Sequence, residues 1–284
     1  MMSEMKTTVF TPDSPLRNPL GMLKAMLSDL LASRELAWQL ALRDIRAQYR
    51  QAALGLLWAF ILPLANTAVW LFIQRTGIVT LQSTIIPYPV YVFSGTMLWA
   101  IFMDAVNAPL QQTTAAKPML AKINFPREAL VVSGIYQALF NAAIKVGVLL
   151  VALILLGVIP GWGLVAFPVA ILSLILAGTA LGLLITPIGL LYTDVGKGLP
   201  LLLQFLMYLT PVVFPMPNSG WAATLFHFNP LTSIILTARN LLTGFTPEYI
   251  STFLLVNLGM LVLLGLVWVV YRVAMPILVE RMSA

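Results

Sequence analysis

Several long stretches of the chain contain no Asp, Glu, Lys or Arg, and they constrain the fold more than any other feature. They include residues 51–74, 76–103, 146–193 and 249–271. Each exceeds the ~20 apolar residues that a helix needs to cross a bilayer, whereas a helix on a water-soluble protein keeps a charged face. The stretches are rich in Leu and Ala and lack the two-residue alternation of barrel strands. The sequence therefore predicts an all-α integral membrane protein, because backbone polar groups in lipid must be satisfied within the spanning helix.

Six transmembrane helices are expected in this chain. Their approximate bounds are 53–73, 89–111, 131–156, 164–191, 199–214 and 250–271. Residues 1–52 then form an N-terminal region, and residues 53–284 form the membrane domain. Thirteen of the 16 Lys and Arg residues fall on the N-terminal side of the membrane, and two fall on the other side. Because Lys and Arg concentrate on the cytoplasmic side, both termini of this multi-pass protein are expected in the cytoplasm.

The N-terminal region is amphipathic rather than membrane-spanning. Three arginines recur at helical spacing, at Arg43, Arg46 and Arg50, and an apolar stripe runs beside them from Trp38 to Tyr49. This pattern predicts interface helices that lie on the membrane with a basic face toward phosphate headgroups. The cytoplasmic excess of Lys and Arg also explains the net charge of +6, so nucleic-acid binding is not expected.

The sequence lacks a G-x-x-x-x-G-K-[ST] phosphate-binding loop, so we expect no ATPase activity and no catalytic residues in this chain. It has no Cys and one His, which excludes thiolate and multi-histidine metal sites. Asp104 is the one acidic residue expected within a span, whereas ion-driven carriers need ionisable groups at mid-membrane. These observations together indicate a permease that is driven by a separate subunit.

Polar residues recur every four positions along the third expected span. They are Ser133, Gln137, Asn141 and Lys145. At ~100° per residue they form one slanted stripe, and a lysine this deep costs roughly 2.5–3.5 kcal/mol unless it faces a partner or water. Two interpretations remain open. The stripe is either a polar channel wall, in which Lys145 attracts a substrate phosphate, or a contact that holds two helices together.

Two aromatic pairs lie deep in the expected spans, each with a spacing of three residues. They are Trp99 with Phe102 and Phe205 with Tyr208. Residues three apart share one face of a helix. Because sugar rings stack on aromatic faces, these pairs are candidates for a carbohydrate channel, and ordinary packing is the other explanation.

The external connection, residues 215–249, is too apolar for a solvated loop. Within it, Asn229 suits a helix N-cap, Pro230 suits the first helical position and Gly244 suits the stop. We expect one or two short helices there that dip back into the outer leaflet as a re-entrant segment.

Four stretches together resemble the permeases of type-2 ATP-binding-cassette polysaccharide exporters, which handle O-antigens, teichoic acids and capsules. Residues 43–63 (RDIRAQYRQAALGLLWAFILP) are similar to the start of their first span, and residues 95–102 (GTMLWAIF) to their second span. Residues 124–130 (NFPREAL) look like their cytoplasmic F-P-R-E segment, and residues 229–231 (NPL) like their last external segment. The resemblance covers residues 35–272, with the stretches in the expected order.

The resemblance implies a homodimer of this chain with two copies of an ATPase subunit, which would bind the ATP and Mg, so no cofactor is expected here. It implies a lipid-linked polysaccharide on undecaprenyl diphosphate, moved across the cytoplasmic (inner) membrane. It also implies that the coupling segment 112–128 docks on the ATPase and that the region 215–249 gates the exit. The coupling candidates are Lys117, Met119, Leu120, Lys122, Ile123, Phe125, Arg127 and Glu128. The gate candidates are Trp221, Asn229, Pro230 and Arg239.

Several hypotheses remain open beside this one. The substrate diphosphate needs cations, which Arg46, Arg50 and Lys145 are placed to supply. The stretch that contains Phe125 is either a coupling helix or only a positively charged anchor. The main alternative function is a type-2 exporter of drugs or other lipids. A membrane enzyme acting on polyprenyl phosphates would need acidic metal-binding clusters, which the sequence lacks, and a scaffolding protein is the remaining alternative.

Overall fold

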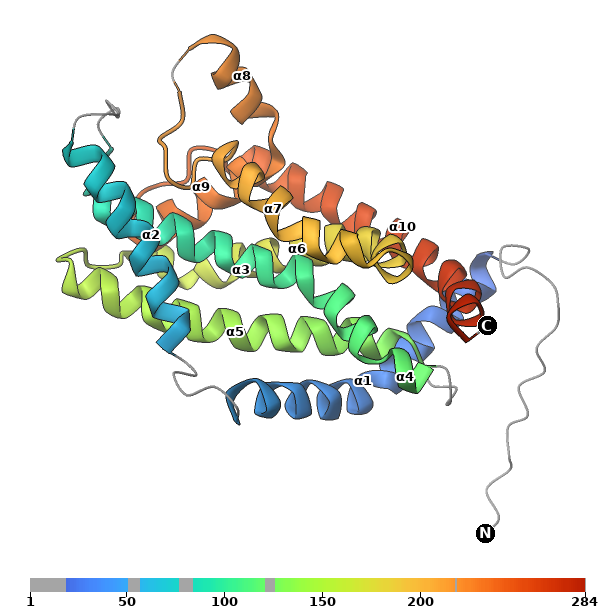
Figure 1. Ribbon diagram of the computed structural model, residues 1–284. Helices are drawn as coiled ribbons and strands as arrows, with labels where there is room; N and C mark the ends of the chain where they lie inside the picture. Colours follow the sequence, from blue (N-terminus) through green and yellow to red (C-terminus); the bar gives the residue numbers. More distant parts are fainter. Residues whose placement is uncertain (1–18, 51–56, 77–83, 121–125, 218, 284) are drawn as a thin grey trace.

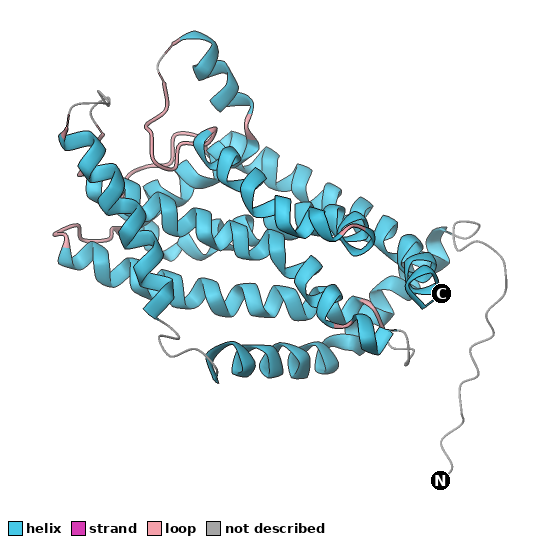
Figure 2. Cartoon of the chain, viewed as in Figure 1, coloured by secondary structure: helices cyan, strands magenta, loops and turns pink. Residues whose placement is uncertain are grey.

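The computed structural model describes residues 19–50, 57–76, 84–120, 126–217 and 219–283 (Figure 1). Throughout these ranges the regular structure is helical, and no strand occurs in them (Figure 2). Four of the helices are long and apolar enough to cross a membrane, by length and composition. They are α3 (Tyr88–Ala115), α5 (Glu128–Leu155), α6 (Phe167–Leu191) and α10 (Ile250–Ser283). The expectation of an all-α membrane protein is confirmed.

Two of the six expected spans form shorter helices. α2 (Trp58–Arg75) has 18 residues and α7 (Thr193–Tyr208) has 16, against the ~20 needed for a full crossing. Residues 51–56, at the start of the first expected span, lie outside the described part of the chain. Four spans are therefore supported by length and composition, and six crossings stay a prediction.

The expected bounds of the last two spans differ from the observed helices. The fifth was expected at 199–214, but α7 begins at Thr193 and ends at Tyr208, and residues 209–214 form turns. Pro211 accounts for the stop, because its ring clashes with the preceding helical turn and disfavours helix at Thr210. The sixth was expected to end at residue 271, whereas α10 continues as one helix to Ser283.

α3 is the central helix of the bundle and packs against α5, α6 and α2 (Figure 1). The contact with α6 is close because Gly178 and Gly182 face the α3 backbone. A Cβ at Gly178 would lie 2.6 Å from the Ala105 Cβ, and a Cβ at Gly182 would collide with the Val106 carbonyl oxygen. Small residues at this spacing let two membrane helices approach at backbone distance.

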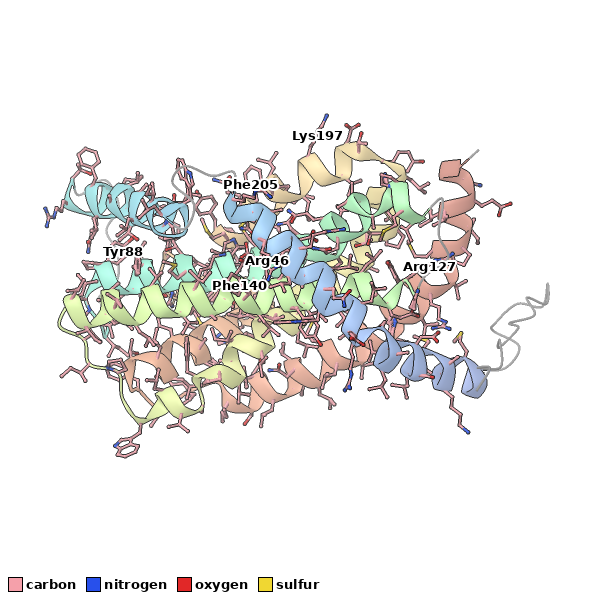
Figure 3. The ribbon with its side chains drawn as sticks, turned by 90° about the horizontal axis from the view of Figure 1, so that it is seen from below. Arg46, Tyr88, Arg127, Phe140, Lys197 and Phe205 are labelled. Carbon is pink, nitrogen blue, oxygen red and sulfur yellow. The ribbon has the colours of Figure 1, made fainter. Side chains whose placement is uncertain are left out.

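In the described part of the N-terminal region the chain forms one helix, α1 (Pro19–Arg50), where the pattern predicted interface helices. One face of α1, which includes Ala37 and Leu40, is buried in a core shared with α5. Leu27 and Leu31 are exposed. Figure 3 shows α1 crossing below α5, with Arg46 on the crossing helix. An exposed apolar surface beside membrane helices suits an interface helix, and that role stays a prediction.

The connection expected on the outer side, residues 215–249, contains two short helices, α8 (Gly220–Phe228) and α9 (Pro230–Thr243), as expected. The boundary residues of α9 also act as expected. The Asn229 side chain accepts a hydrogen bond from the Leu231 N–H, Pro230 begins the helix, and Gly244 ends it with a φ of 83°. A 3-10 helix, η3 (Trp162–Val165), precedes α6 and packs against α9.

The segment expected to couple to the ATPase, residues 112–128, contains one short helix in its described part, α4 (Lys117–Leu120). α4 and the C-terminal end of α10 lie at one end of the bundle, and α9 lies toward the other end (Figure 1). The candidate residues for coupling and for gating are therefore separated along the length of the molecule.

Candidate functional site

A cleft of about 860 Å³ lies between α2, α3, α5 and α7. Its wall combines polar side chains, such as Asn66 and Asn107, with aromatic ones, such as Trp70 and Tyr208. Polar cavities inside a bundle of membrane helices are costly to maintain and mark substrate or ion paths. The cleft is therefore the candidate transport site of this chain.

Lys145 and Asp104 form an ion pair on the wall of this cleft. The Lys145 Nζ lies 2.5 Å from the Asp104 Oδ2 and also donates to the Ala100 carbonyl oxygen at 3.1 Å. Lys145 thus joins α5 to α3 and also lines the cleft, so each of the two interpretations describes part of its position. Because Asp104 balances its charge, Lys145 is a weaker candidate for binding a substrate phosphate.

Ser133 and Gln137, two further residues of the polar stripe on α5, belong to a chain of side-chain hydrogen bonds. Gln112 Nε2 donates to Gln137 Oε1 at 2.8 Å. Ser133 Oγ donates to Gln112 Oε1 and Gln137 Nε2 donates to Gln48 Oε1, both at 3.5 Å. A second cleft, of about 500 Å³, shares Gln48 and Asn141 with the first. The polar surface therefore continues from the first cleft toward α1.

Two polar atoms on residues that line the first cleft have no hydrogen-bond partner in the described part of the chain. They are the Nε1 of Trp99 and the Oδ1 of Asn141, and both are buried. A buried polar atom without a partner costs about 1–3 kcal/mol. Because both atoms are buried, a molecule in the cleft would bond to them only after the wall rearranges.

The two deep aromatic pairs have different surroundings. Phe102 is fully buried and packs against Trp99, with 5.1 Å between the ring centroids. Tyr208 lines the cleft beside Trp70, whereas Phe205 is 61% exposed on α7 (Figure 3). Packing therefore explains Phe102, while Trp99 and Tyr208 are placed at the cleft.

Three of the four arginines of α1, Arg43, Arg46 and Arg50, line one cavity of about 670 Å³ on that helix. All three side chains are exposed, and the Arg43 Nε lies 2.7 Å from the Asp44 Oδ1. Asp44 offsets the charge of Arg43, so Arg46 and Arg50 contribute most of the positive charge of this cavity. Such a cavity suits a phosphate group at the membrane surface.

The coupling segment is described only at its two ends. Three of its candidates lie outside the described residues: Lys122, Ile123 and Phe125. At the start of the segment, the Lys117 Nζ donates to the Leu190 carbonyl oxygen at 3.0 Å. Leu120 is buried in a core that the chain itself supplies, and Met119 packs at the edge of that core. The side chain of Leu120 therefore supports the fold rather than an exposed docking surface.

At the end of the segment, Glu128 belongs to a cluster of charges that joins three helices. Arg272 of α10 donates to Glu128 Oε1 at 2.5 Å and to Asp29 Oδ2 of α1 at 2.6 Å. Burial lowers the pKa of the neighbouring Arg127 guanidinium, while Tyr271 and Glu128 act in the opposite direction. Glu128, expected as a docking residue, thus has its partner within the chain.

Arg239, expected in the external gate, is buried, with 2% of its surface exposed. Its guanidinium lies over the Tyr91 ring, 3.7 Å from the centroid. It donates to the carbonyl oxygens of Pro211 at 2.9 Å and Val212 at 3.0 Å, and to the Ser94 Oγ at 3.3 Å. Arg239 therefore fastens α9 to α3 and to the turns after α7.

Further side chains bind carbonyl groups of those turns, residues 209–214. The Tyr91 hydroxyl lies 3.1 Å from the carbonyl oxygens of Pro211 and Phe214, and the Tyr88 hydroxyl donates to that of Val213 at 3.3 Å. The Asn229 Nδ2 donates to the carbonyl oxygen of Leu209 at 2.8 Å. Non-helical backbone at membrane depth is tolerated only where the protein satisfies its polar groups, and this segment meets that requirement.

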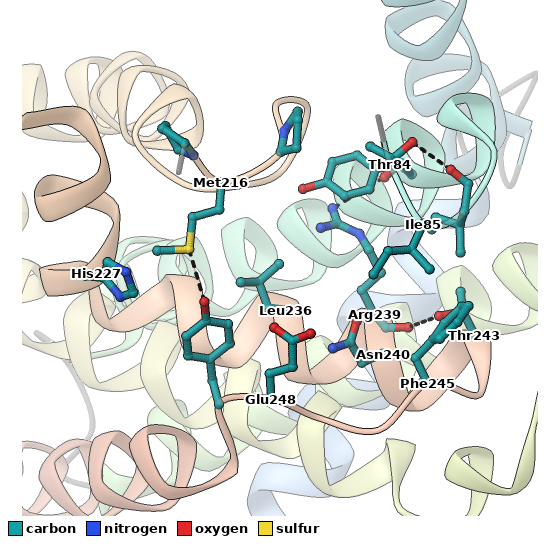
Figure 4. Close-up of a pocket in the computed structure, with 15 residues that line it drawn as sticks. Thr84, Ile85, Met216, His227, Leu236, Arg239, Asn240, Thr243, Phe245 and Glu248 are labelled. Carbon is teal, nitrogen blue, oxygen red and sulfur yellow. Dashed lines mark hydrogen bonds between the residues drawn. The ribbon is translucent and has the colours of Figure 1, made fainter. Parts of the chain in front are cut away.

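A cavity of about 660 Å³ lies beside Arg239, under the turns that precede α8 (Figure 4). Across it, the Tyr249 hydroxyl donates to the Met216 sulfur at 3.5 Å. Trp221 on α8 is 81% exposed. Among the gate candidates, Arg239 and Asn229 are therefore held by hydrogen bonds to the turns at residues 209–214, whereas the Trp221 side chain is exposed.

The sequence interpretation missed two ion pairs that shape these sites: Asp104 with Lys145, and Glu128 with Arg272. The partners are 41 and 144 residues apart in the chain. One signal was available for the first pair, because an ionisable residue inside a membrane span usually pairs with another. In the second pair, Glu128 is the first residue of α5 and Arg272 directly follows the last expected span, so that rule does not apply.

Comparison with known sequences shows that residues 35–243 match the ABC-2 type transporter family. The chain belongs to this family. The matched range contains the cleft, the coupling segment and α9. The match confirms the resemblance to type-2 ATP-binding-cassette permeases that the sequence indicated. The names of individual relatives add to it.

Three relatives of this chain are named for the export or transport of polysaccharides. The O-antigen export system permease protein RfbA of Myxococcus xanthus is 25% identical over 213 residues, which cover 74% of this chain and 81% of the relative. RfbA of Klebsiella pneumoniae is 24% identical over 215 residues, covering 73% and 80%. The polysialic acid transport protein KpsM of Escherichia coli is 25% identical over 241 residues, covering 77% and 88%.

Proposed function

We propose that this chain is the permease subunit of an ATP-driven exporter that moves a lipid-linked polysaccharide across the cytoplasmic membrane. The observation that carries the proposal is the polar and aromatic cleft between α2, α3, α5 and α7 in a member of the ABC-2 type transporter family. A sugar chain needs such a path through an apolar bundle. The names of the relatives, which refer to O-antigen export and polysialic acid transport, support the substrate class.

Uncharged sugar residues are the part of the substrate that the cleft suits. The amide groups of Asn66 and Asn107 on the cleft wall can bond to sugar hydroxyls. Tyr208 and Trp70 offer aromatic rings nearby. Because Lys145 is paired with Asp104, the two add no net charge to the wall, which also contains Lys197.

Arg46 and Arg50 of α1 suit the other part of the substrate, the diphosphate of an undecaprenyl carrier. Arg46 and Arg50 are exposed cations beside the membrane helices, where a lipid-linked diphosphate arrives. We expect Arg46→Gln with Arg50→Gln to weaken loading of the substrate. Arg34→Gln is the matched control, because Arg34 is exposed on the same helix but lies outside this cavity.

The partners follow from the proposed function. A separate ATPase subunit, present in two copies, binds ATP and Mg and docks on the coupling segment. A second copy of this chain completes a homodimer. Exposed apolar side chains on α2 and α7, such as Phe72, Leu202 and Phe205, flank the cleft and provide a surface that the second copy can cover. In this proposal the chain crosses the membrane six times, with both termini in the cytoplasm.

Deletion of the gene for this chain tests the proposal. The deletion strain is expected to lose its surface polysaccharide and to accumulate lipid-linked polymer inside the cell, and a complementing copy is expected to reverse both effects. Normal surface polysaccharide in the deletion strain would contradict the proposal. Normal polysaccharide together with altered drug resistance or altered lipids would favour the alternative, a type-2 exporter of drugs or other lipids.

A further inference from the structure

Arg272 joins three parts of the chain that lie far apart in the sequence. From its place on α10, one guanidinium nitrogen bonds to Glu128 at the first residue of α5, and another bonds to Asp29 on α1. These partners are 144 and 243 residues away from it. A planar guanidinium can serve two carboxylates at once in fixed directions, which the point charge of a lysine does less well.

The two carboxylates differ in how much they depend on Arg272. The Glu128 side chain is 7% exposed, whereas the Asp29 side chain is 42% exposed. A buried carboxylate without a cation carries a large desolvation cost, while an exposed one is hydrated by water. The position of Glu128, and with it the start of α5, therefore depends on Arg272.

The coupling segment is attached to the body of the chain at both of its described ends. Leu120, at the end of α4, is buried in a core that includes Leu130, Leu190 and Tyr271. Glu128, at the other end, is held by Arg272. Figure 3 shows Arg127, the residue before Glu128, where the start of α5 meets α1 and α10. A force on either of these ends is therefore passed to the helices that they contact.

α10 connects this end of the molecule to the opposite end. Its 34 residues span ~50 Å at 1.5 Å per residue. It packs against α6 and α9, and it begins directly after Tyr249, which lines the external cavity. Arg272 lies on this helix, so the contact with Glu128 links the coupling segment to the external end through one continuous element.

We propose that Arg272 is a positioning residue for ATPase coupling. It fixes the end of the coupling segment to α10 and α1, so that movement of the segment is transmitted along α10 to the external end. This inference rests on the proposed function, because it requires an ATPase docked on the segment. The sequence indicated the residues after 271 only as a tail. In this inference the end of α10 is part of the path that couples the ATPase to the permease.

The test uses the whole permease with its ATPase subunit, reconstituted in vesicles that contain undecaprenyl-diphosphate-linked glycan from the same organism. The variant is Arg272→Met combined with Glu128→Gln, which removes the link without leaving a buried charge unpaired. We expect this variant to assemble and to hydrolyse ATP, but to move at least about fivefold less glycan per ATP. The single variant Arg272→Lys keeps one contact, so the glycan that it moves per ATP is expected to lie between the values of the double variant and of the wild type. Arg281→Met, an exposed arginine on the same helix, is the control and should export normally.

Two outcomes separate this inference from the proposed function. If the double variant moves as much glycan per ATP as the wild type, Arg272 is only structural and the inference is overturned, while the proposed function stands. If the wild-type complex moves no glycan and the deletion strain keeps its surface polysaccharide, both fail. Should the double variant not assemble, the amount of glycan that Arg272→Lys moves per ATP decides. A value below that of the wild type supports the inference, and a wild-type value overturns it.

Discussion

Arg239 shows how much of a fold one buried side chain can hold. Its guanidinium serves acceptors on α3 and on the turns after α7 while it lies over Tyr91. A lysine at this position has no planar fork and leaves several buried carbonyl groups without donors. We expect Arg239→Lys to destabilise the permease by at least about 2 kcal/mol.

Tryptophan fluorescence during thermal unfolding in detergent measures this loss. The matched control is Arg75→Lys, because Arg75 is exposed at the end of α2 and should tolerate the change. Equal unfolding temperatures for the two variants would mean that the carbonyl groups of residues 209–214 find other donors.

The Lys145–Asp104 pair permits a second prediction at this scale. Lys145→Met leaves the Asp104 carboxylate without its cation, and we expect a loss of about 1–2 kcal/mol. The loss stays below the ~3–5 kcal/mol typical of fully buried pairs because Asp104 is 32% exposed. Adding Asp104→Asn should recover most of the stability, as measured by thermal unfolding of the four members of the mutant cycle. No recovery would show that Lys145 acts mainly through the Ala100 carbonyl.

At the scale of whole elements, the contact between α3 and α6 depends on glycine. A methyl group at Gly182 would collide with the Val106 carbonyl oxygen, so Gly182→Ala must push the two helices apart. We expect a loss of about 1–3 kcal/mol from this overpacking, measured by thermal unfolding.

Gly147→Ala on α5 is the control for this prediction. A Cβ at Gly147 meets no atom within 4 Å, and alanine favours helix over glycine by roughly 0.5–1 kcal/mol. This variant should therefore be neutral or slightly more stable. If both alanine variants behave alike, the close approach of α3 and α6 does not limit stability.

At the scale of the whole molecule, the proposed orientation can be tested by labelling. The chain contains no cysteine, so single cysteines can be introduced without background. We expect Trp221→Cys to react with a membrane-impermeant maleimide in intact cells, because Trp221 is exposed on α8 at the external end. Leu27→Cys on α1, also exposed, should react only after the membrane is opened. Labelling of Leu27→Cys in intact cells would reverse the orientation.

The parts of the structure that local chemistry controls were predictable from the sequence. Uncharged runs identified the membrane class, and the four helices of spanning length lie where they were expected. Asn229, Pro230 and Gly244 marked the bounds of α9, because N-caps, first-turn prolines and left-handed glycines act on their own backbone. The same rules did not extend to residues 209–214, whose carbonyl groups are satisfied by side chains from distant helices.

What the sequence alone determined is therefore the kind of chain and the ends of several helices. The tertiary structure decided which faces are buried and which charges meet. An apolar side chain that faces lipid looks the same in sequence as one that faces another helix, since lipid tails are as apolar as leucine. Buried residues make up 78% of the most apolar window of α3 but 11% of that of α10, although α10 is the more hydropathic. Likewise, only the packing of distant helices places Arg239 inside the core and Arg272 beside Glu128, because these contacts join residues far apart in the sequence.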